Sequence, residues 1–128
     1  MTDSQLLQAA RAARQNAYAP HSSFAVGAAL SSPDGVFAGC NVENISFGLT
    51  MCAERVAVGA AVAAGVRQFD RLAIVSESSD PVVPCGACRQ VLAEFNSDLR
   101  IISSSVSGAA TEFSLAELLP LPRQGILR

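Results

Sequence analysis

The amino-acid sequence predicts a single α/β domain in which a mixed β-sheet carries helices on both faces. Short apolar runs rich in β-branched residues alternate along the chain with segments of helical periodicity, an order that is typical of this class. The chain has 128 residues, and neither an internal repeat nor a linker-like stretch divides it. Half of the residues are hydrophobic and only 16% are charged, which is enough apolar material for a core. We therefore expect one domain over residues 1–128.

The first half of the chain predicts a helix, a β-hairpin and a second helix. Gln5–Tyr18 is rich in alanine with apolar residues at helical spacing. Phe24–Asn44 contains two apolar runs around the turn signal Ser31–Gly35, which indicates a hairpin. A loop then leads to a helix over Cys52–Ala64, which Gly65 is expected to end.

The second half predicts strands that alternate with helices. Arg71–Ser78 has the pattern of a third strand, and Cys85–Phe95 that of a helix. Leu99–Ser105 and Gly108–Ser114 are expected to be the fourth and fifth strands, followed by a short helix over Leu115–Leu119. The remaining tail contains two prolines and is expected to be irregular.

Charge and hydropathy exclude several classes of partner. The formal net charge is −2, and the nine basic residues are all arginines scattered along the chain, so no basic stripe exists to bind a nucleic acid. No apolar run approaches the ~20 residues that span a bilayer, so we expect no membrane partner. The N-terminal residues lack the pattern of a signal peptide, so a cytoplasmic location is expected. Thiols stay reduced there, which favours metal binding or catalysis over disulfides for the four cysteines.

Three cysteines occur at places that favour a shared metal ion. Cys85 and Cys88 are three residues apart and share one face of a predicted helix, with Pro84 at its first turn. Cys52 stands at the start of the other long helix. The N-terminus of a helix carries unpaired N–H groups and a partial positive charge, which stabilise thiolates. Thiolates bind zinc, so the spacing predicts a zinc site.

Three ligands are one fewer than a structural zinc site normally has. A fourth ligand would come from Cys40 or His21, but Cys40 is interpreted as a small buried residue of a strand and His21 as a loop residue or pocket wall. An open position would admit water, whose pKa zinc lowers from 15.7 to about 7. Glu54 follows Cys52 by two residues and is well placed to move the proton of that water. A redox pair and a structural zinc module remain alternatives, although neither gives Glu54 a role.

Taken together, C-x-E at one helix start and P-C-x-x-C at another form the signature of zinc deaminases, with Cys52 in place of a histidine. At these residues the chain resembles the small homotetrameric cytidine deaminases. The matching segments are "FAVGAAL", "GCNVEN", "CAER", "PCGACRQVLAEF" and "ELLP". They run from about Tyr18 to Pro120 in the order and spacing of that family.

The resemblance implies a fold and an activity. The fold would be a three-layer α-β-α sandwich around a mixed five-stranded sheet. The reaction would be the hydrolysis of cytidine and deoxycytidine to uridine and deoxyuridine plus ammonia, in pyrimidine salvage. One zinc ion per subunit would activate the water that attacks C4 of the base. The partners would be a pyrimidine nucleoside and three further copies of the chain, with neighbouring subunits completing each pocket.

The same resemblance implies roles at the zinc site. Cys52, Cys85 and Cys88 would be the ligands, and Glu54 would carry protons to ring N3 and to the departing amine. Arg55 would donate hydrogen bonds to the ligand sulfurs. Three thiolates on Zn²⁺ leave a net negative charge, which an adjacent arginine offsets.

Five further positions would bind the substrate. Asn41 and Glu43 would hydrogen-bond the ribose hydroxyls, and their spacing of two puts them on one face of a strand. In the alternative, both are polar residues in solvent at the end of a strand. Phe24 would pack on the pyrimidine ring. The backbone N–H of Ala53 would hold O2 of the base, and the carbonyl near Val83 would accept from the departing amine.

The chain departs from the family pattern at three positions. His21 and Phe47 stand where tyrosines are usual, and Arg123 stands where an aromatic residue normally follows "ELLP". All three are candidate pocket walls, and an arginine can also stack on a base. The missing aromatic favours a second hypothesis, in which a more open pocket accepts modified cytosine nucleosides such as N4-substituted cytidines or blasticidin S.

Overall fold

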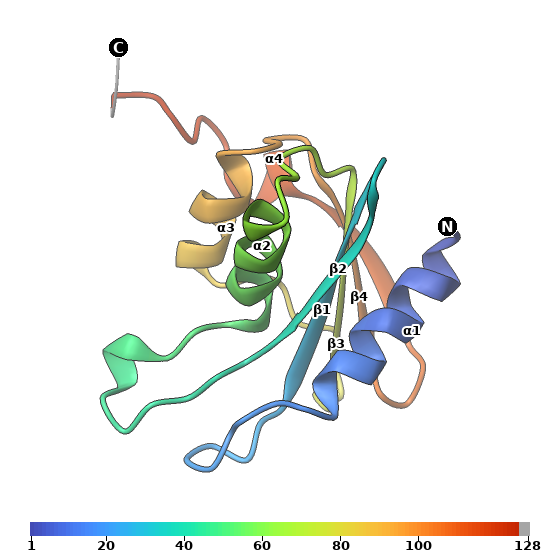
Figure 1. The fold of residues 1–128 in the computed structure, drawn as a ribbon, viewed down its shortest axis with the longest axis vertical. Helices are drawn as coiled ribbons and strands as arrows, with labels where there is room; N and C mark the ends of the chain where they lie inside the picture. The colour runs from blue at the N-terminus through green and yellow to red at the C-terminus, as the bar shows by residue number, and fades with distance from the viewer. Residues whose placement is uncertain (126–128) are drawn as a thin grey trace.

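A computed structural model describes residues 1–125 as a five-stranded sheet with helices on both faces, as the sequence predicts (Figure 1). The sheet has the order β2-β1-β3-β4-β5. Its strands are β1 (Val26–Ser32), β2 (Gly35–Cys40), β3 (Arg71–Ser76), β4 (Arg100–Ser105) and β5 (Ala110–Ser114). The helices are α1 (Asp3–Arg14), α2 (Ala53–Ala63), α3 (Gly86–Ala93) and α4 (Leu115–Leu118), with a 3₁₀ turn η1 (Phe47–Leu49).

The sheet is mixed because its connections differ in kind. The turn between β1 and β2 closes an antiparallel hairpin, and β3 pairs with the other edge of β1 in the antiparallel sense. The chain then crosses over through α3, so β4 runs parallel to β3, as a crossover connection requires. β5 returns antiparallel to β4 and forms one edge of the sheet. This path places the N-terminus of α3 just after the β3 strand and its loop.

Of the helices in residues 1–125, only α1 covers the face of the sheet opposite to α2 and α3 (Figure 1). It begins with a capping box, in which the backbone N–H of Gln5 donates to the Thr2 hydroxyl and that of Thr2 to the Gln5 side chain. Leu6 and Ala10 are buried on its inner side. The predicted end at Tyr18 is wrong: α1 ends at Arg14, because the Tyr18 N–H leaves the helix and donates to the Asn41 carbonyl.

Helices α2 and α3 cover the opposite face and enclose the larger core (Figure 1). Ala57 and Ala61 of α2 are fully buried and let this helix approach the sheet closely. Helix and sheet come close together at Gly39 of β2, where a Cβ atom would lie 2.5 Å from the Ala57 nitrogen. Glycine at that position therefore sets how near α2, and the residues at its N-terminus, lie to the sheet.

The hairpin is shorter than predicted. β2 ends at Cys40. Beyond it the Asn41 N–H still donates to the Val26 carbonyl, but Val42 forms isolated bridges with Tyr18 and Met51 rather than with β1. Residues 41–52 instead bow away from the sheet before entering α2 (Figure 1). The other strands and helices differ from the prediction by one or two residues at their ends, as is normal for such boundaries.

The C-terminal tail is irregular where the structure describes it, at residues 120–125, and the last three residues of the predicted tail lie outside the described part. Within residues 1–125, no helix is both long and apolar enough to cross a membrane.

Candidate metal centre

Three thiols from two helix N-termini meet on the α2–α3 side of the sheet. Cys52 is the N-cap of α2 and Cys85 the N-cap of α3, both with extended backbone. Cys88 follows in the first turn of α3, so its side chain lies on the same face as that of Cys85. The three Sγ atoms lie within 4.8 Å of one another, and those of Cys52 and Cys85 are 3.8 Å apart. The folded chain thus joins a residue that precedes β3 to two that follow it.

The geometry of these thiols fits a tetrahedral zinc ion. Ligands placed about 2.3 Å from a tetrahedral centre are about 3.8 Å apart, which matches the Cys52–Cys85 spacing. Cys88 is fully buried, whereas Cys85 is exposed, so the group has a closed side and a side open to solvent. Cys40 is half-buried at the end of β2 and is not a member of the group. Residues 1–125 thus offer three candidate ligands at this place, one fewer than a closed tetrahedral site has.

The electrostatics of the thiols already favour charge on Cys52. Hydrogen bonds from Cys88, Arg55 and Cys85 lower the pKa of the Cys52 thiol to about 5 against the opposing effect of burial. The hydrogen bond to Cys52 and burial raise the pKa of Cys88. Without metal, negative charge is thus favoured on Cys52 and a proton on Cys88. Binding of a metal would displace that proton, because thiolates are the ligating form.

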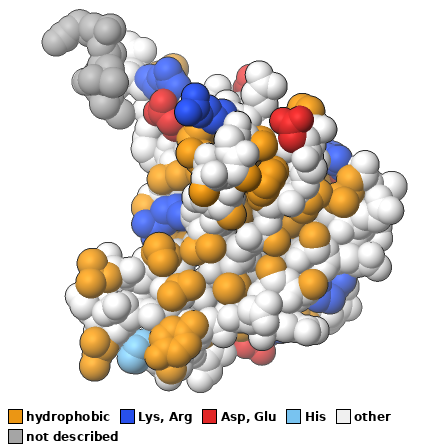
Figure 2. All heavy atoms as spheres, viewed as in Figure 1, with side chains coloured by type: hydrophobic (Ala, Val, Ile, Leu, Met, Phe, Trp, Pro, Cys, Tyr) orange, Lys and Arg blue, Asp and Glu red, His pale blue; other side chains and the backbone are white. Residues whose placement is uncertain are grey.

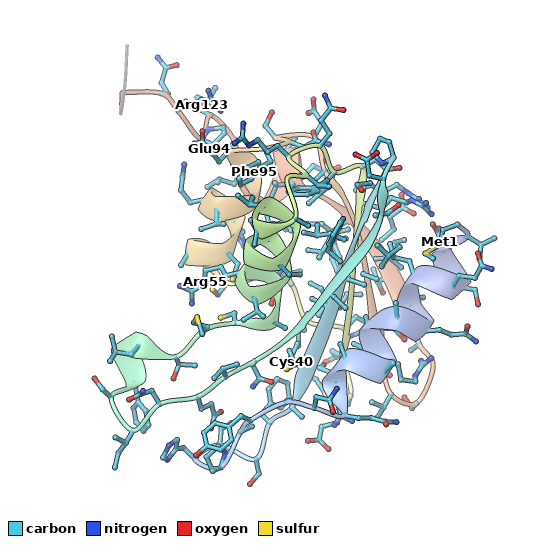
Figure 3. The ribbon with its side chains drawn as sticks, viewed as in Figure 1. Met1, Cys40, Arg55, Glu94, Phe95 and Arg123 are labelled. Atoms are coloured by element: carbon cyan, nitrogen blue, oxygen red, sulfur yellow. The ribbon has the colours of Figure 1, made fainter. Side chains whose placement is uncertain are left out.

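Arg55 connects this group to the chain that precedes α2. Its guanidinium donates one hydrogen bond to Cys52 Sγ at 3.5 Å and another to the Thr50 carbonyl at 3.3 Å. The hydrogen bond to Cys52 raises the pKa of Arg55. In residues 1–125 its buried Nε has no hydrogen-bond partner. Figure 3 shows Arg55 at the N-terminal end of α2, beside sulfur atoms.

Glu54 is buried at the second position of α2, with 5% of its surface exposed. Burial raises the pKa of its carboxyl to about 7, and the nearby Cys52 charge acts in the same direction. A carboxyl group with a pKa near neutrality can both accept and release a proton at physiological pH. The side chain that follows the first thiol by two residues therefore has the properties of a general acid–base group.

Asn41 and Glu43 are not free polar residues in solvent, as the alternative interpretation held. The Asn41 side chain accepts from Val26 N–H at 2.9 Å and donates to the Phe24 carbonyl at 2.8 Å. Glu43 accepts from the backbone N–H groups of His21 and Ser22 at 2.9 and 3.1 Å, and also from the Ser22 hydroxyl. The Ser22 hydrogen bond is the main cause that lowers the pKa of Glu43. Both side chains thus fasten the segment of residues 21–26.

The other predicted pocket residues lie on the segments that surround α2 and α3. Phe24 is half-buried just before β1, and Ala53 is the fully buried first residue of α2. Val83 is half-buried in the loop that leads through Pro84 to Cys85. The N–H of Ala53 occupies a position that an α-helix leaves without an internal acceptor.

The three residues that depart from the family pattern lie in two separate regions: His21 and Phe47 together, and Arg123 elsewhere. The ring of His21 meets that of Phe47 edge-on, with centroids 6.2 Å apart. Both rings line a hollow with Ser22, Glu43 and Thr50. Figure 2 shows hydrophobic side chains gathered around the protein's one histidine.

Arg123 lies at the other end of α3 from Cys85, where it donates to the Glu94 carbonyl at 3.0 Å (Figure 3). It therefore contributes no wall to the thiol group of its own chain.

Two residues at this site escaped the sequence analysis. Ser22 is the hydroxyl partner of Glu43, and Arg89 donates to the Pro84 carbonyl at 2.8 Å and to the Leu118 carbonyl at 3.0 Å. Arg89 thereby holds the residue before Cys85 against α4. The sequence carried little signal for either, because Glu43 lies 21 residues from Ser22 and Leu118 lies 29 residues from Arg89.

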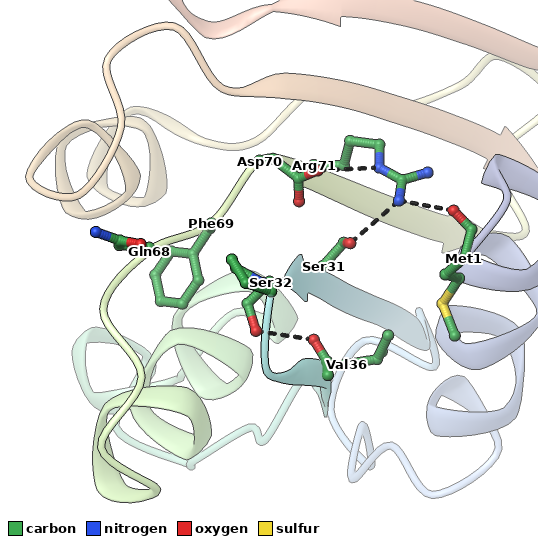
Figure 4. A pocket seen from close by; sticks show the side chains of 10 residues that line it. Met1, Ser31, Ser32, Val36, Gln68, Phe69, Asp70 and Arg71 are labelled. Carbon is green, nitrogen blue, oxygen red and sulfur yellow. Dashed lines mark hydrogen bonds and ion pairs between the residues drawn. The ribbon is translucent and has the colours of Figure 1, made fainter.

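A second hollow lies away from the thiols, between the β1–β2 turn and the start of β3 (Figure 4). Its arginine is already engaged: Arg71 donates to the Met1 carbonyl, to the Ser31 hydroxyl and to Asp3, and pairs with Asp70. The side-chain charges of Arg71 and Asp70 in this hollow are thus already engaged with each other and with neighbouring residues.

Comparison with known proteins agrees with this geometry. Residues 1–104 match the family model described as the cytidine and deoxycytidylate deaminase zinc-binding region. The chain belongs to this deaminase family. A cytidine deaminase from Sporosarcina psychrophila is 47% identical over 117 residues, which cover 90% of this chain and 86% of that protein. A cytidine deaminase from Mycobacterium tuberculosis is 44% identical over 109 residues, covering 84% and 79%.

Solved structures extend the similarity to the fold. The crystal structure of cytidine deaminase from Burkholderia pseudomallei superposes with a TM-score of 0.91 at 50% identity, over 94% of this chain and 98% of that one. A three-layer deaminase fold and a cysteine cluster that fits zinc are thus properties of this chain. The chain is an enzyme of the deaminase family, and zinc is its cofactor.

Proposed function

We propose that this chain hydrolyses cytidine and deoxycytidine to uridine and deoxyuridine, with release of ammonia. The observation that carries the proposal is the buried carboxyl of Glu54 beside the group of three thiols. A structural zinc site needs no general acid–base group, whereas hydrolytic deamination needs one that moves two protons. The relatives named cytidine deaminase support the choice of substrate.

In this proposal Cys52, Cys85 and Cys88 hold one zinc ion per subunit. When bound there, zinc acts as a Lewis acid that lowers the pKa of the attacking water. Arg55 offsets the charge of the three thiolates through its hydrogen bond to Cys52, which keeps the site electrophilic. The two helix N-termini that carry Cys52 and Cys85 act in the same direction.

Glu54 is the proton shuttle of the proposed reaction. It takes a proton from water and delivers it to ring N3 while the water oxygen bonds to C4. It then takes the second proton of that oxygen and delivers it to the exocyclic amine, and the C4–N bond breaks to release ammonia. A pKa of about 7 suits both directions of transfer at neutral pH.

The remaining pocket residues orient the nucleoside. Glu43 accepts from a sugar hydroxyl, the Asn41 side chain hydrogen-bonds the sugar hydroxyls as well, and Phe24 packs against the pyrimidine ring. The N–H of Ala53 donates to O2 of the base, at a helix position with a free donor. The carbonyl near Val83 accepts from the departing amine.

The proposed assembly is a homotetramer whose pockets are completed by neighbouring subunits. Large apolar side chains near the site support it: Ile45 is 84% exposed, Phe47 76% and Leu49 66%. Such a cluster is typical of a protein–protein interface rather than of a monomer surface. His21, Phe47 and Arg123 would then be pocket walls, and Arg123 would act in the pocket of a neighbour. The proposed setting is pyrimidine salvage in the cytoplasm, without nucleic acid or membrane partners.

The test is one preparation with two measurements. The purified protein is expected to contain about one zinc per chain and to reduce the absorbance of cytidine as uridine forms. Zinc without turnover of any cytosine nucleoside would favour a structural zinc module. Absence of zinc together with a reversible Cys85–Cys88 disulfide would favour a redox module. Size-exclusion chromatography with light scattering tests the tetramer independently.

A further inference from the structure

We propose that Ser22 is a positioning residue that aims the one remaining acceptor site of Glu43 at a sugar hydroxyl of the nucleoside. The inference rests on the proposed function, because it concerns how the substrate of that reaction is held. It concerns the loop before β1, which contributes no metal ligand and no catalytic group.

The hydrogen bonds of the Glu43 carboxylate carry the inference. An ionised carboxylate has about four acceptor positions. Oε1 accepts from the backbone N–H groups of His21 at 2.9 Å and Ser22 at 3.1 Å, which uses both of its positions. Oε2 accepts from the Ser22 hydroxyl, which uses one more. A single position on Oε2 remains, and the Ser22 hydrogen bond determines where it points.

The Ser22 hydroxyl has a second contact that stiffens this arrangement. Its oxygen accepts from the N–H of Phe24 at 3.0 Å, so one hydroxyl ties Glu43 to the residue proposed to pack on the base. Ser23 between them has a φ of 59°, in the left-handed region that non-glycine residues rarely adopt. Its N–H donates to the Ala19 carbonyl at 3.0 Å, which helps to hold that conformation. The loop is therefore kept in an uncommon shape by its contacts with Glu43 and Ala19.

Glu43 lines a hollow whose wall is linked to the thiol group through Thr50 and Arg55. Ser22 and Glu43 line this hollow together with Phe47 and Thr50. The Thr50 carbonyl accepts from Arg55, and Arg55 donates to Cys52. A nucleoside with its base at the thiols can thus have its sugar near Glu43. Because only one position is free, Glu43 accepts one further hydrogen bond, and a sugar hydroxyl is a neutral donor that suits it.

The experiment combines two Ser22 variants and one control variant with two substrates. Ser22→Ala removes the hydroxyl, Ser22→Thr keeps it, and Ser78→Ala is a control in the loop after β3. Cytidine carries the sugar hydroxyls, and 2′,3′-dideoxycytidine lacks both. In Ser22→Ala we expect KM for cytidine to rise about tenfold with little change in kcat, since a hydrogen bond to a charged acceptor is misdirected. KM for the dideoxynucleoside should stay unchanged, and Ser22→Thr should restore wild-type KM.

Binding of the product gives a readout that needs no turnover. By calorimetry, Ser22→Ala should bind uridine about tenfold more weakly than the wild type and bind 2′,3′-dideoxyuridine equally well. If Ser22→Ala weakened the binding of both nucleosides equally, or left KM for cytidine unchanged in an active enzyme, Ser22 would have no positioning role, while the proposed function would stand. A wild-type protein that holds zinc but neither converts nor binds any of these nucleosides would overturn the proposed function, and the role of Ser22 with it.

Discussion

The guanidinium of Arg55 lies 3.5 Å from the sulfur of Cys52 and donates a hydrogen bond to it from one turn further along α2. The same guanidinium donates to the Thr50 carbonyl, so two hydrogen bonds, one to Cys52 and one to the residue two positions before it, fix its position. A cation in this position offsets part of the charge that three thiolates would add to a zinc ion. It also ties the loop before α2 to the metal centre, which makes Arg55 the natural first target for mutation.

Replacing Arg55 with glutamine is expected to weaken zinc binding and turnover. The variant loses the charge-assisted hydrogen bond to sulfur. Substitutions next to metal ligands typically reduce metal affinity or activity by roughly 10- to 100-fold. Competition with a chromogenic chelator measures the affinity, and cytidine absorbance measures kcat. Arg67→Gln, at an exposed arginine after α2, is the control. Wild-type zinc affinity and kcat in Arg55→Gln would show that the hydrogen bond has no role.

Replacing Glu54 with glutamine is expected to separate zinc binding from catalysis. The amide keeps the size of the side chain but cannot carry a proton, so kcat should fall by roughly 10²- to 10⁴-fold or more. Zinc content should remain that of the wild type, because the thiols are untouched. Glu117→Gln, at an exposed glutamate of α4, should leave both unchanged. A Glu54→Gln protein with near wild-type kcat would remove Glu54 from the mechanism.

The cysteines offer a matched pair of substitutions. Cys88→Ser removes a fully buried thiol of the metal group, so we expect loss of zinc and a lower melting temperature. Cys40→Ser changes a half-buried thiol outside that group and should keep zinc. Metal analysis and thermal unfolding, with and without a chelator, measure both effects. If Cys40→Ser lost zinc and Cys88→Ser kept it, the ligand set proposed above would be wrong.

Acid is expected to weaken the attachment of α1 to the sheet. Hydrogen bonds from Arg100 and Arg71 lower the pKa of Asp3. A carboxyl with a lowered folded-state pKa stabilises the fold above its unfolded pKa of about 3.9, and this contribution disappears as the pH falls through the folded value.

Urea unfolding of Asp3→Asn should therefore show a deficit at pH 7 that shrinks and is lost as the pH falls below the usual range of a carboxyl group. The deficit should be about 1 kcal/mol or less, since Asp3 is 41% exposed and such ion pairs are weak. Asp34→Asn, in the exposed β1–β2 turn, serves as the reference. A deficit that persists unchanged at low pH would point to helix capping rather than to the ion pairs.

Alanine substitutions at two glycines, one facing α2 and one within it, are expected to change stability in opposite directions. In Gly39→Ala the new Cβ would lie 2.5 Å from the Ala57 nitrogen and 2.6 Å from the Ala53 carbonyl, so α2 must move outward. We expect a loss of about 1–3 kcal/mol in unfolding free energy together with weaker zinc binding. Gly59 lies within α2 with open space around it, so Gly59→Ala should stabilise by up to about 1 kcal/mol. Chemical unfolding and zinc competition test both, and an equally stable Gly39→Ala would contradict the close packing.

Periodicity and motif spacing were sufficient to predict the class of the fold. The order of helices and strands, the mixed sheet and the helices on both faces follow from residues close together in the chain, and the structure confirms them. The ends were less well predicted. α1 stops at Arg14 and β2 at Cys40, because Tyr18 and Val42 form a bridge with each other. That bridge depends on a fold already formed, so local patterns do not reveal it.

The sequence alone identified the three cysteines and Glu54 as candidates for a zinc site, because ligand type and position at a helix start are local properties. Only the tertiary structure brought the Cys52 sulfur within 3.8 Å of the Cys85 sulfur, since that distance depends on how α2 and α3 pack beside each other on one face of the sheet. The tertiary structure also brought the Ser22 hydroxyl into hydrogen-bond contact with Glu43, and it placed Arg123 beside Glu94 rather than at the thiols. Hydrogen-bond partners more than 20 residues apart are determined by the path of the backbone, which no short stretch of sequence contains.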